Sequence, residues 1–202
     1  MIEIKQLRKK DFNMARKFAI EGMHISWYTN NKIELYFYSK YFWYLEITKA
    51  TRALGAYMGD RLVGVLLAEM KNKPKVFKSI WYDAYIKIAT FIMNLGYKDA
   101  TGAYDDANKE MLAEYLKRNT VDGELIFFAV DPDIKGKGIG TLLLNEFERL
   151  EKGKRIYLYT DTGSTYQFYT HRGFEEVGRK DISIVNGKKK VPLTCLLFSK
   201  IL

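Results

Sequence analysis

Hydrophobic and polar residues alternate with a period of two in residues 2–7 and 155–160, as in a strand whose successive side chains point to opposite faces. Six segments in all are predicted to be strands. They cover residues 2–7, 53–58, 61–69, 155–160, 174–184 and 191–201. Gly59-Asp60 and Asn186-Gly187 separate neighbouring members of this set, and both dipeptides tolerate the positive φ angles of tight turns. The pattern therefore predicts two β-hairpins.

Apolar residues recur every three to four positions in a second set of segments, which predicts helices with one face turned to the core. These segments cover residues 12–23, 33–49, 76–95, 105–118, 139–150 and 164–171. Leu125–Val130 is instead a continuous apolar run, which we expect to be a strand buried on both faces. This order of elements predicts an α/β (α+β) fold, a mixed, mostly antiparallel central sheet flanked by helices.

The length and composition bound the number of domains. The chain has 202 residues, of which 48% are hydrophobic, enough for one domain with a sizeable core. We expect a single domain over residues 1–202, with a helical insertion at about 71–120, because no repeat or linker marks a second domain. Residues 33–49 are unusually aromatic, which favours core packing and leaves a ligand wall open.

The charge balance is basic, since 33 Lys and Arg face 24 Asp and Glu, for a formal net charge of +9. Such a balance suits a polyanionic partner, either nucleic acid or a phosphate-rich ligand, but it also serves solubility alone, so nucleic acid is not the expected partner. The one cysteine, Cys195, cannot form an internal disulfide, and the first residues contain no apolar signal-peptide core. The most apolar long stretch carries Asp83 and Lys87, which argues against a membrane span. We therefore expect a cytoplasmic protein.

A glycine-rich segment between the apolar run and the following helix carries the candidate chemistry. It reads Asp131-Pro132-Asp133-Ile134-Lys135-Gly136-Lys137-Gly138-Ile139-Gly140-Thr141. Glycines allow close approach of the backbone to a ligand, and the start of a helix offers unpaired N–H groups and the positive end of its dipole. Together with the two lysines and the Thr141 hydroxyl, this predicts a site for a phosphate or diphosphate.

Two common phosphate motifs fit this segment less well. A Walker loop requires Ser or Thr after Gly-Lys, where this chain has Gly138, and a further glycine where it has Asp131. A dinucleotide fingerprint places its third glycine where Thr141 stands, although Asp161 lies near the distance expected for a ribose-binding carboxylate. Dinucleotide binding therefore stays open as an alternative.

Lys135-Gly136-Lys137-Gly138-Ile139-Gly140 resembles the pyrophosphate loop of the GNAT superfamily of acyl-CoA-dependent N-acetyltransferases. That loop reads Gln or Arg, two residues, Gly, one residue, then Gly or Ala, so Lys135 departs from it while keeping the positive charge. The later segment 165–174, with Phe168-Tyr169 followed after three residues by Gly173-Phe174, resembles a helix of the same family. The resemblance extends over about 124–200 and also covers 2–69.

The resemblance implies an enzyme that moves acetyl from acetyl-CoA to a primary amine by direct attack in a ternary complex. The strand residues that would bind pantetheine are Phe128, Ala129 and Val130. The residues that would surround the diphosphate are Lys135, Gly136, Lys137, Gly138, Ile139, Gly140 and Thr141, with Thr162 and Ser164 as further cofactor contacts. Tyr169 takes the place of the general acid, because a phenol with a pKa of about 10 is protonated at neutral pH.

A base must accept the proton of the attacking ammonium, directly or through water. Glu69, at the end of a predicted strand, is the first candidate, and we expect burial beside Leu66, Leu67 and Met70 to raise its pKa. Glu124 is a second candidate. The acceptor would be a small-molecule or peptide amine, bound between the aromatic stretch 27–44, the region of Glu69 and the insertion.

Other functions compete with acetyl transfer. A non-catalytic acyl-CoA-binding module would keep the loop without the chemistry, and a nucleic-acid-binding protein would use the basic surface instead. No metal site is expected, because His24 and His171 lack partner residues at ligand spacing. A homodimer is compatible with these residues.

Overall fold

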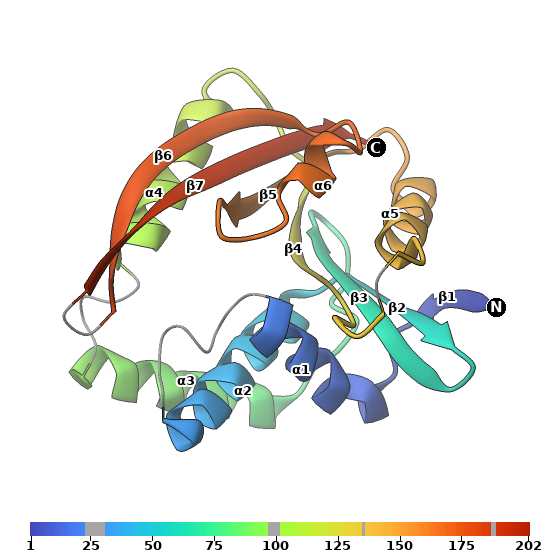
Figure 1. The fold of residues 1–202 in the computed structure, drawn as a ribbon, viewed down its shortest axis with the longest axis horizontal. Helices are drawn as coiled ribbons and strands as arrows, with labels where there is room; N and C mark the ends of the chain where they lie inside the picture. Colours follow the sequence, from blue (N-terminus) through green and yellow to red (C-terminus); the bar gives the residue numbers. More distant parts are fainter. Residues whose placement is uncertain (23–30, 97–101, 135, 187–188) are drawn as a thin grey trace. The chain divides into compact units, whose positions relative to one another are not determined.

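The computed structural model describes residues 1–22, 31–96, 102–134, 136–186 and 189–202. Three residues singled out above lie outside the described residues. They are His24, Lys135 and, from the second predicted turn, Gly187. The chain divides into two compact units (Figure 1). The first comprises Met1–Lys87 and Leu125–Lys152, and the second Ile88–Glu124 and Gly153–Leu202.

Three antiparallel strands open the first unit. They are β1 (Ile2–Gln6), β2 (Arg52–Met58) and β3 (Arg61–Met70). β2 pairs with both β1 and β3, and Gly59 takes a φ of +61° in the turn of the hairpin. The predicted first hairpin is confirmed, and nearly all of β3 is buried because its residues are overwhelmingly apolar.

Two helices contribute to the core of the first unit. They are α1 (Phe12–Gly22) and α2 (Lys32–Lys49), and α1 follows a short 3₁₀ turn, η1 (Lys9–Asp11). α1 buries Phe12, Ala15 and Phe18, three residues of the face that its periodicity predicts. Trp43 of α2 is 1% exposed and packs edge-on against Phe12 at a centroid distance of 5.4 Å.

The helix after the glycine-rich segment, α5 (Ile139–Leu150), packs on the same unit. A Cβ on Gly64 of β3 would lie 2.9 Å from Ile139 and 3.0 Å from Leu143, so only glycine allows this close approach. At the far end, the buried Glu151 carboxylate accepts hydrogen bonds from Arg52 Nε at 2.5 Å and Lys73 Nζ at 2.6 Å. Burial opposes its ionisation, but the hydrogen bonds of Lys73 and Arg52 outweigh burial and lower its pKa.

The second unit is built from a strand, a hairpin and helices. Its elements include α4 (Gly102–Leu116), β5 (Arg155–Asp161), α6 (Gln167–Thr170), β6 (Glu175–Asn186) and β7 (Lys189–Ile201). β7 pairs antiparallel with β5 on one side and with β6 on the other, which confirms the closing hairpin. α4 packs on β6, where Gly178 would place a Cβ 3.1 Å from Met111.

Two elements have residues in both units. β4 (Gly123–Val130) contributes Gly123 and Glu124 to the second unit, where they pair in parallel with Ile156 and Tyr157 of β5. The other is α3 (Ile80–Gly96), which with α4 makes residues 71–120 mainly helical, as predicted. The parallel and antiparallel pairs together give the predicted mixed sheet, while a single domain stays a prediction.

The prediction that Leu125–Val130 is buried on both faces is wrong. Burial alternates along β4, so that Leu125, Phe127 and Ala129 are buried and the residues between them are only partly covered. A continuous apolar run shows that a strand can be enclosed, but the elements packed on each face decide whether it is.

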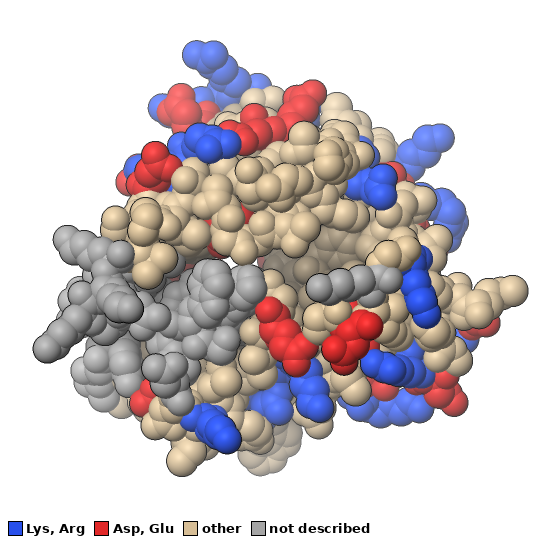
Figure 2. Space-filling model, in the orientation of Figure 1, with Lys and Arg blue, Asp and Glu red and all other residues tan. Residues whose placement is uncertain are grey.

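Basic and acidic side chains are interspersed on the face of the molecule that Figure 2 presents. Several form pairs three residues apart within one element, such as Glu146 with Arg149 and Glu176 with Arg179. Such exposed pairs contribute roughly 0–1 kcal/mol each to stability, and we assign them no functional role.

Candidate functional site

Two glycines shape the connection between β4 and α5. Gly136 has a φ of +74° and Gly138 a φ of +67°, both in the left-handed region that L side chains rarely adopt. Gly138 is the N-cap of α5, and its carbonyl accepts the first helical hydrogen bond, from Leu142 N at 3.0 Å. A Cβ on either glycine would meet nothing within 4 Å. Glycine is therefore required at both positions by the φ angle and not by crowding.

The amides of Ile139, Gly140 and Thr141 precede that first helical bond, as expected at the start of a helix. The Ile139 side chain is 2% exposed and anchors the helix start in the first unit, while Lys137 is exposed. A row of amides at the positive end of a 12-residue helix, next to a lysine, suits an anion of the size of a phosphate.

Asp131 holds the start of this connection, a role that sequence reasoning missed. Its buried carboxylate accepts from Arg61 at 2.6 Å and from the Asp133 amide at 3.1 Å, while its own amide donates to Val63 O. The Asp-Pro-Asp sequence was a signal for such a turn, since Asp side chains commonly bond the amide two residues on. The partner Arg61 lies 70 positions away in the sequence, and no local pattern indicates it.

The strand residues predicted to bind pantetheine differ in exposure. Ala129 is buried in the core of the first unit, whereas Phe128 and Val130 are half-buried. The ladder between β4 and β5 consists of the Gly123–Ile156 and Glu124–Tyr157 pairs. The three predicted pantetheine residues therefore come later in β4 than the two residues that pair with β5.

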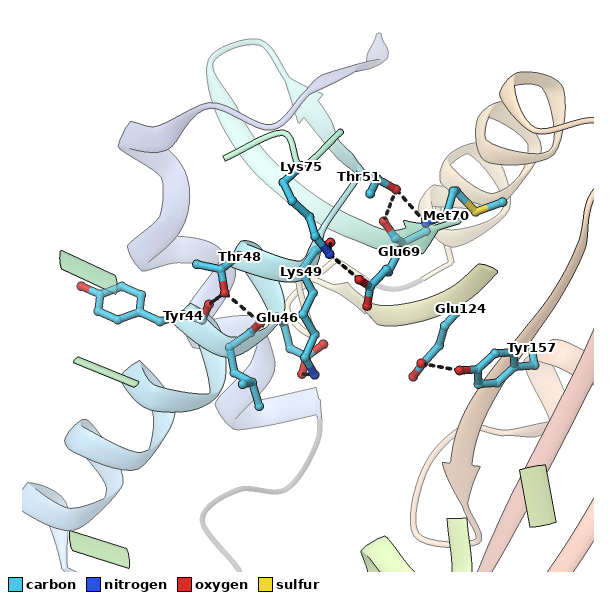
Figure 3. A network of polar contacts seen from close by, with 12 residues as sticks. Tyr44, Glu46, Thr48, Lys49, Thr51, Glu69, Met70, Lys75, Glu124 and Tyr157 are labelled. Atoms are coloured by element: carbon cyan, nitrogen blue, oxygen red, sulfur yellow. Dashed lines mark hydrogen bonds and ion pairs between the residues drawn. The ribbon is translucent and has the colours of Figure 1, made fainter. Parts of the chain in front are cut away.

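Glu69 occupies the predicted strand end, but the expectation that it is buried is wrong. Its side chain is 40% exposed, and its carboxylate pairs with Lys75, whose ammonium also donates to Lys49 O at 2.7 Å (Figure 3). Leu67, on the same face of β3, is buried, so the exposure of Glu69 reflects its place at the end of the strand and not a solvent-facing side of β3.

Tyr169 lies in the short helix α6, in the second unit. Its ring meets Phe174 at a centroid distance of 5.6 Å and Phe198 at 6.1 Å. Its carbonyl accepts from the amides of Arg172 and Phe174, which ties the end of α6 to the start of β6. Burial raises the pKa of the Tyr169 phenol, so it is a proton donor at neutral pH.

The hydroxyls of Thr162 and Ser164 both support the turn that follows β5. Ser164 Oγ lies 2.6 Å from Thr160 Oγ1 and donates to Asp161 O at 2.8 Å. Thr162 Oγ1 accepts from Thr194 N of β7 at 3.2 Å. These contacts give each residue a structural role, and their contact with a cofactor stays a prediction.

The described part of the aromatic stretch combines the two interpretations left open by the sequence. Trp43 belongs to the core, while Tyr36 and Phe37 are about half exposed. The Lys40 ammonium lies 5.7, 5.6 and 5.3 Å from the ring centroids of Tyr36, Tyr44 and Tyr85. These rings therefore already surround a cation of the chain itself.

Comparison with protein families assigns the segment that contains the glycine-rich connection and Tyr169. Residues 101–176 match the family model described as acetyltransferase (GNAT) domain. The match covers less than half of the chain, and it assigns this segment to a GNAT acetyltransferase domain. It includes the glycine-rich connection and Tyr169, and it supports an acyltransferase.

Several solved structures of acetyltransferases share the fold of this chain. Drosophila melanogaster polyamine N-acetyltransferase, which catalyses the formation of N-acetylagmatine, matches with a TM-score of 0.61, 13% identity and 100% of both chains covered. A Corynebacterium glutamicum structure described as histone acetyltransferase HPA2 and related acetyltransferase matches with a TM-score of 0.58 and 15% identity, over 97% of this chain and 94% of that chain. Arabidopsis thaliana Naa50, in complex with the bisubstrate analogue CoA-Ac-MVNAL, matches with a TM-score of 0.50 and 15% identity, over 100% and 99%.

A search of curated proteins found no match to this chain. None of the helices in the described part of the chain combines the length and apolar character needed to cross a membrane.

Proposed function

We propose that this chain transfers the acetyl group of acetyl-CoA to a primary amine, by direct attack of the amine on the thioester. The observation that carries the proposal is the pair of left-handed glycines, Gly136 and Gly138, beside the first amides of α5 in a segment that matches the GNAT domain. This arrangement suits a diphosphate, the group that acetyl-CoA carries.

The connection between β4 and α5 would hold acetyl-CoA chiefly through its backbone. The amides of residues 136–141 donate to the diphosphate, and the exposed Lys137 adds countercharge. The backbone of Phe128, Ala129 and Val130 hydrogen-bonds the pantetheine arm as an added strand would. The bound thioester supplies the electrophilic carbonyl carbon.

Two proton transfers complete the reaction. The amine nitrogen forms a bond to the carbonyl carbon as the carbon–sulfur bond breaks, and the leaving thiolate takes the proton of Tyr169 Oη. Because burial raises the pKa of this phenol, Tyr169 holds its proton until the thiolate develops. The proton lost by the amine passes, directly or through water, to a carboxylate, for which Glu69 and Glu124 are the candidates.

Glu69 would act as this base together with Lys75. The ion pair orients the carboxylate, and an approaching ammonium competes with Lys75 for the same oxygen atoms. The half-exposed position leaves room for a water molecule to relay the proton.

The acceptor class is proposed from chemistry and from the similar structures. One of them forms N-acetylagmatine, and another binds an analogue that joins CoA to a peptide, so the fold serves both small amines and peptide amines. We propose a small or amphipathic amine, because aromatic rings suit a cation or an apolar stem. The lone, buried Cys195 is consistent with a reducing compartment, and we propose the cytoplasm.

Thermal unfolding with and without ligand tests the proposal. Acetyl-CoA at 100 times its Kd should stabilise the native state by about 2.7 kcal/mol and raise the Tm, while NAD and ATP at equal concentration should not. Mass spectrometry should then detect an acetylated product from a panel of primary amines. Stabilisation by NAD alone would instead support the dinucleotide-binding alternative. Binding of acetyl-CoA without any acetylated product would identify a non-catalytic acyl-CoA-binding module.

A further inference from the structure

One face of β5 in the second unit presents polar and aromatic side chains at alternate positions. Ile156, Leu158 and Thr160 are buried on one side of the strand. Tyr157, Tyr159 and Asp161 share the other side and are only partly covered. Tyr157 and Tyr159 also pack against the core cluster of Met111, Cys195 and Leu197, so a ligand can reach only the uncovered part of this face.

Glu124 is the residue of β4 that pairs with Tyr157 in the parallel ladder. The Tyr157 hydroxyl donates to Glu124 Oε2 at 2.8 Å, as Figure 3 shows. A carboxylate has about four acceptor positions, and this bond orients the group. The geometry is that of a carboxylate held in place at the edge of an aromatic surface.

Tyr159 extends this aromatic surface. Its ring packs edge-on against Tyr157, with centroids 5.4 Å apart and planes at 74°. Burial, followed by the charge of Glu124, raises the pKa of Tyr159, so its hydroxyl is neutral at physiological pH. The lone pairs of a phenol oxygen can accept a hydrogen bond from a ligand.

The neighbouring charges on this face favour a cation. Asp161, on the same side of β5, accepts from Tyr104 Oη of α4 at 3.2 Å. The guanidinium of Arg155, at the start of the strand, donates instead to Tyr115 and to Asn119 at 3.1 Å. Arg155 shares this face of β5, and its guanidinium bonds to neutral partners at the start of the strand. Carboxylates stand at Glu124 and Asp161, with the rings of Tyr157 and Tyr159 between them.

Building on the proposed function, we propose that Glu124, Tyr157 and Tyr159 form the subsite that binds the cationic amino group of the acceptor. The Glu124 carboxylate accepts from the ammonium, the Tyr159 hydroxyl adds an acceptor oxygen, and the ring faces attract the positive charge. Tyr157 acts as a positioning residue, since it holds Glu124 through its hydroxyl. Acceptors that are neutral or anionic at the corresponding position are excluded by the same charges.

The test uses two probes of matching shape and opposite charge, 4-phenylbutylamine and 4-phenylbutanoate. Calorimetric titration of each into the full chain saturated with CoA should show that the amine binds at least about tenfold more tightly than the acid. Glu124→Gln should remove most of that preference, and Tyr159→Phe should weaken amine binding by a few-fold while leaving the melting temperature unchanged. In turnover assays, Glu124→Gln should raise the KM of the amine while the Kd of acetyl-CoA stays constant.

Glu114→Gln is the matched control, because Glu114 is an exposed carboxylate of the same unit that pairs with Lys117. It should change neither probe's affinity. Equal binding of both probes to the unaltered chain, or an unchanged preference in Glu124→Gln, overturns the subsite. Failure of the proposed function is recognised separately, because the unaltered chain would then neither bind acetyl-CoA nor yield an acetylated product.

Discussion

Two connections that each follow a strand contribute to the proposed reaction by different means. Between β4 and α5, the backbone would bind the diphosphate, through left-handed Gly136 and Gly138 and the amides that begin the helix. Between β5 and β6, side chains contribute instead, through the partly buried Tyr169 and the hydroxyls of the turn. The first depends on dihedral angles, and the second on the surroundings of individual side chains.

This difference shows why the first connection is legible in a sequence and the second much less so. Glycines and a helix start form an anion site wherever they occur in this order, because the amides come from the main chain. A tyrosine becomes a useful acid only when other residues, here Phe174 and Phe198, surround it. The two connections should therefore fail differently when altered.

The largest effect is expected from Tyr169→Phe, which removes the proton donor and keeps the ring. Turnover should fall by about 100-fold, within the range typical of a general acid, while the Kd of acetyl-CoA stays constant. Steady-state kinetics and calorimetry measure the two quantities. Tyr166→Phe, on the same segment, is the control and should remain active; a Tyr169→Phe enzyme with full turnover would rule out the acid role.

A smaller effect, on binding, is expected from Gly138→Val. A β-branched residue is strained at a φ of +67°, and the loop must rearrange, so the Kd of acetyl-CoA should rise by about tenfold or more. Gly153→Val is a matched control, since Gly153 has a φ of +79° with open space around it but lies outside the glycine-rich connection. Equal losses of affinity in both variants would mean that general destabilisation, and not the loop, is responsible.

The smallest effect concerns stability at high pH, through Cys195 of the second unit. Burial, followed by the charge of Asp161, raises the pKa of the Cys195 thiol to about 11. The unfolded chain therefore loses this proton at lower pH than the native state, and the free energy of unfolding should fall as pH rises from about 9 to 11. Urea titrations should show a loss about 1 kcal/mol larger than in Cys195→Ala. An equal pH dependence in the two proteins would contradict the burial of the thiol.

Much of the fold could be predicted from local patterns. The two hairpins, the helices and the buried face of α1 with Phe12, Ala15 and Phe18 follow from periodicity alone. The errors concern burial. Glu69 is half-exposed and paired with Lys75, and β4 is fully buried on one face only. Both depend on which elements cover a strand, and that information is spread over the whole chain.

The candidate site divides in the same way. The glycine-rich connection and Tyr169 are visible as short motifs, because their residue types are needed at fixed spacing. The bond from Arg61 to Asp131 and the bond from Tyr157 to Glu124 join residues 70 and 33 positions apart. No local spacing indicates such pairs, since strand pairing and packing create them.

By itself, the sequence determined the order of strands and helices, the backbone geometry of the glycine-rich connection and the resemblance to acetyltransferases. These properties reside in neighbouring residues, whose dihedral preferences and periodicity act over a few positions. Only the tertiary structure decided that Tyr169 is enclosed by apolar rings, that Glu69 pairs with Lys75 and that Glu124 lies beside Tyr157 and Tyr159. Desolvation and charge pairing depend on distances in space, and folding sets those distances between residues that are remote in the chain.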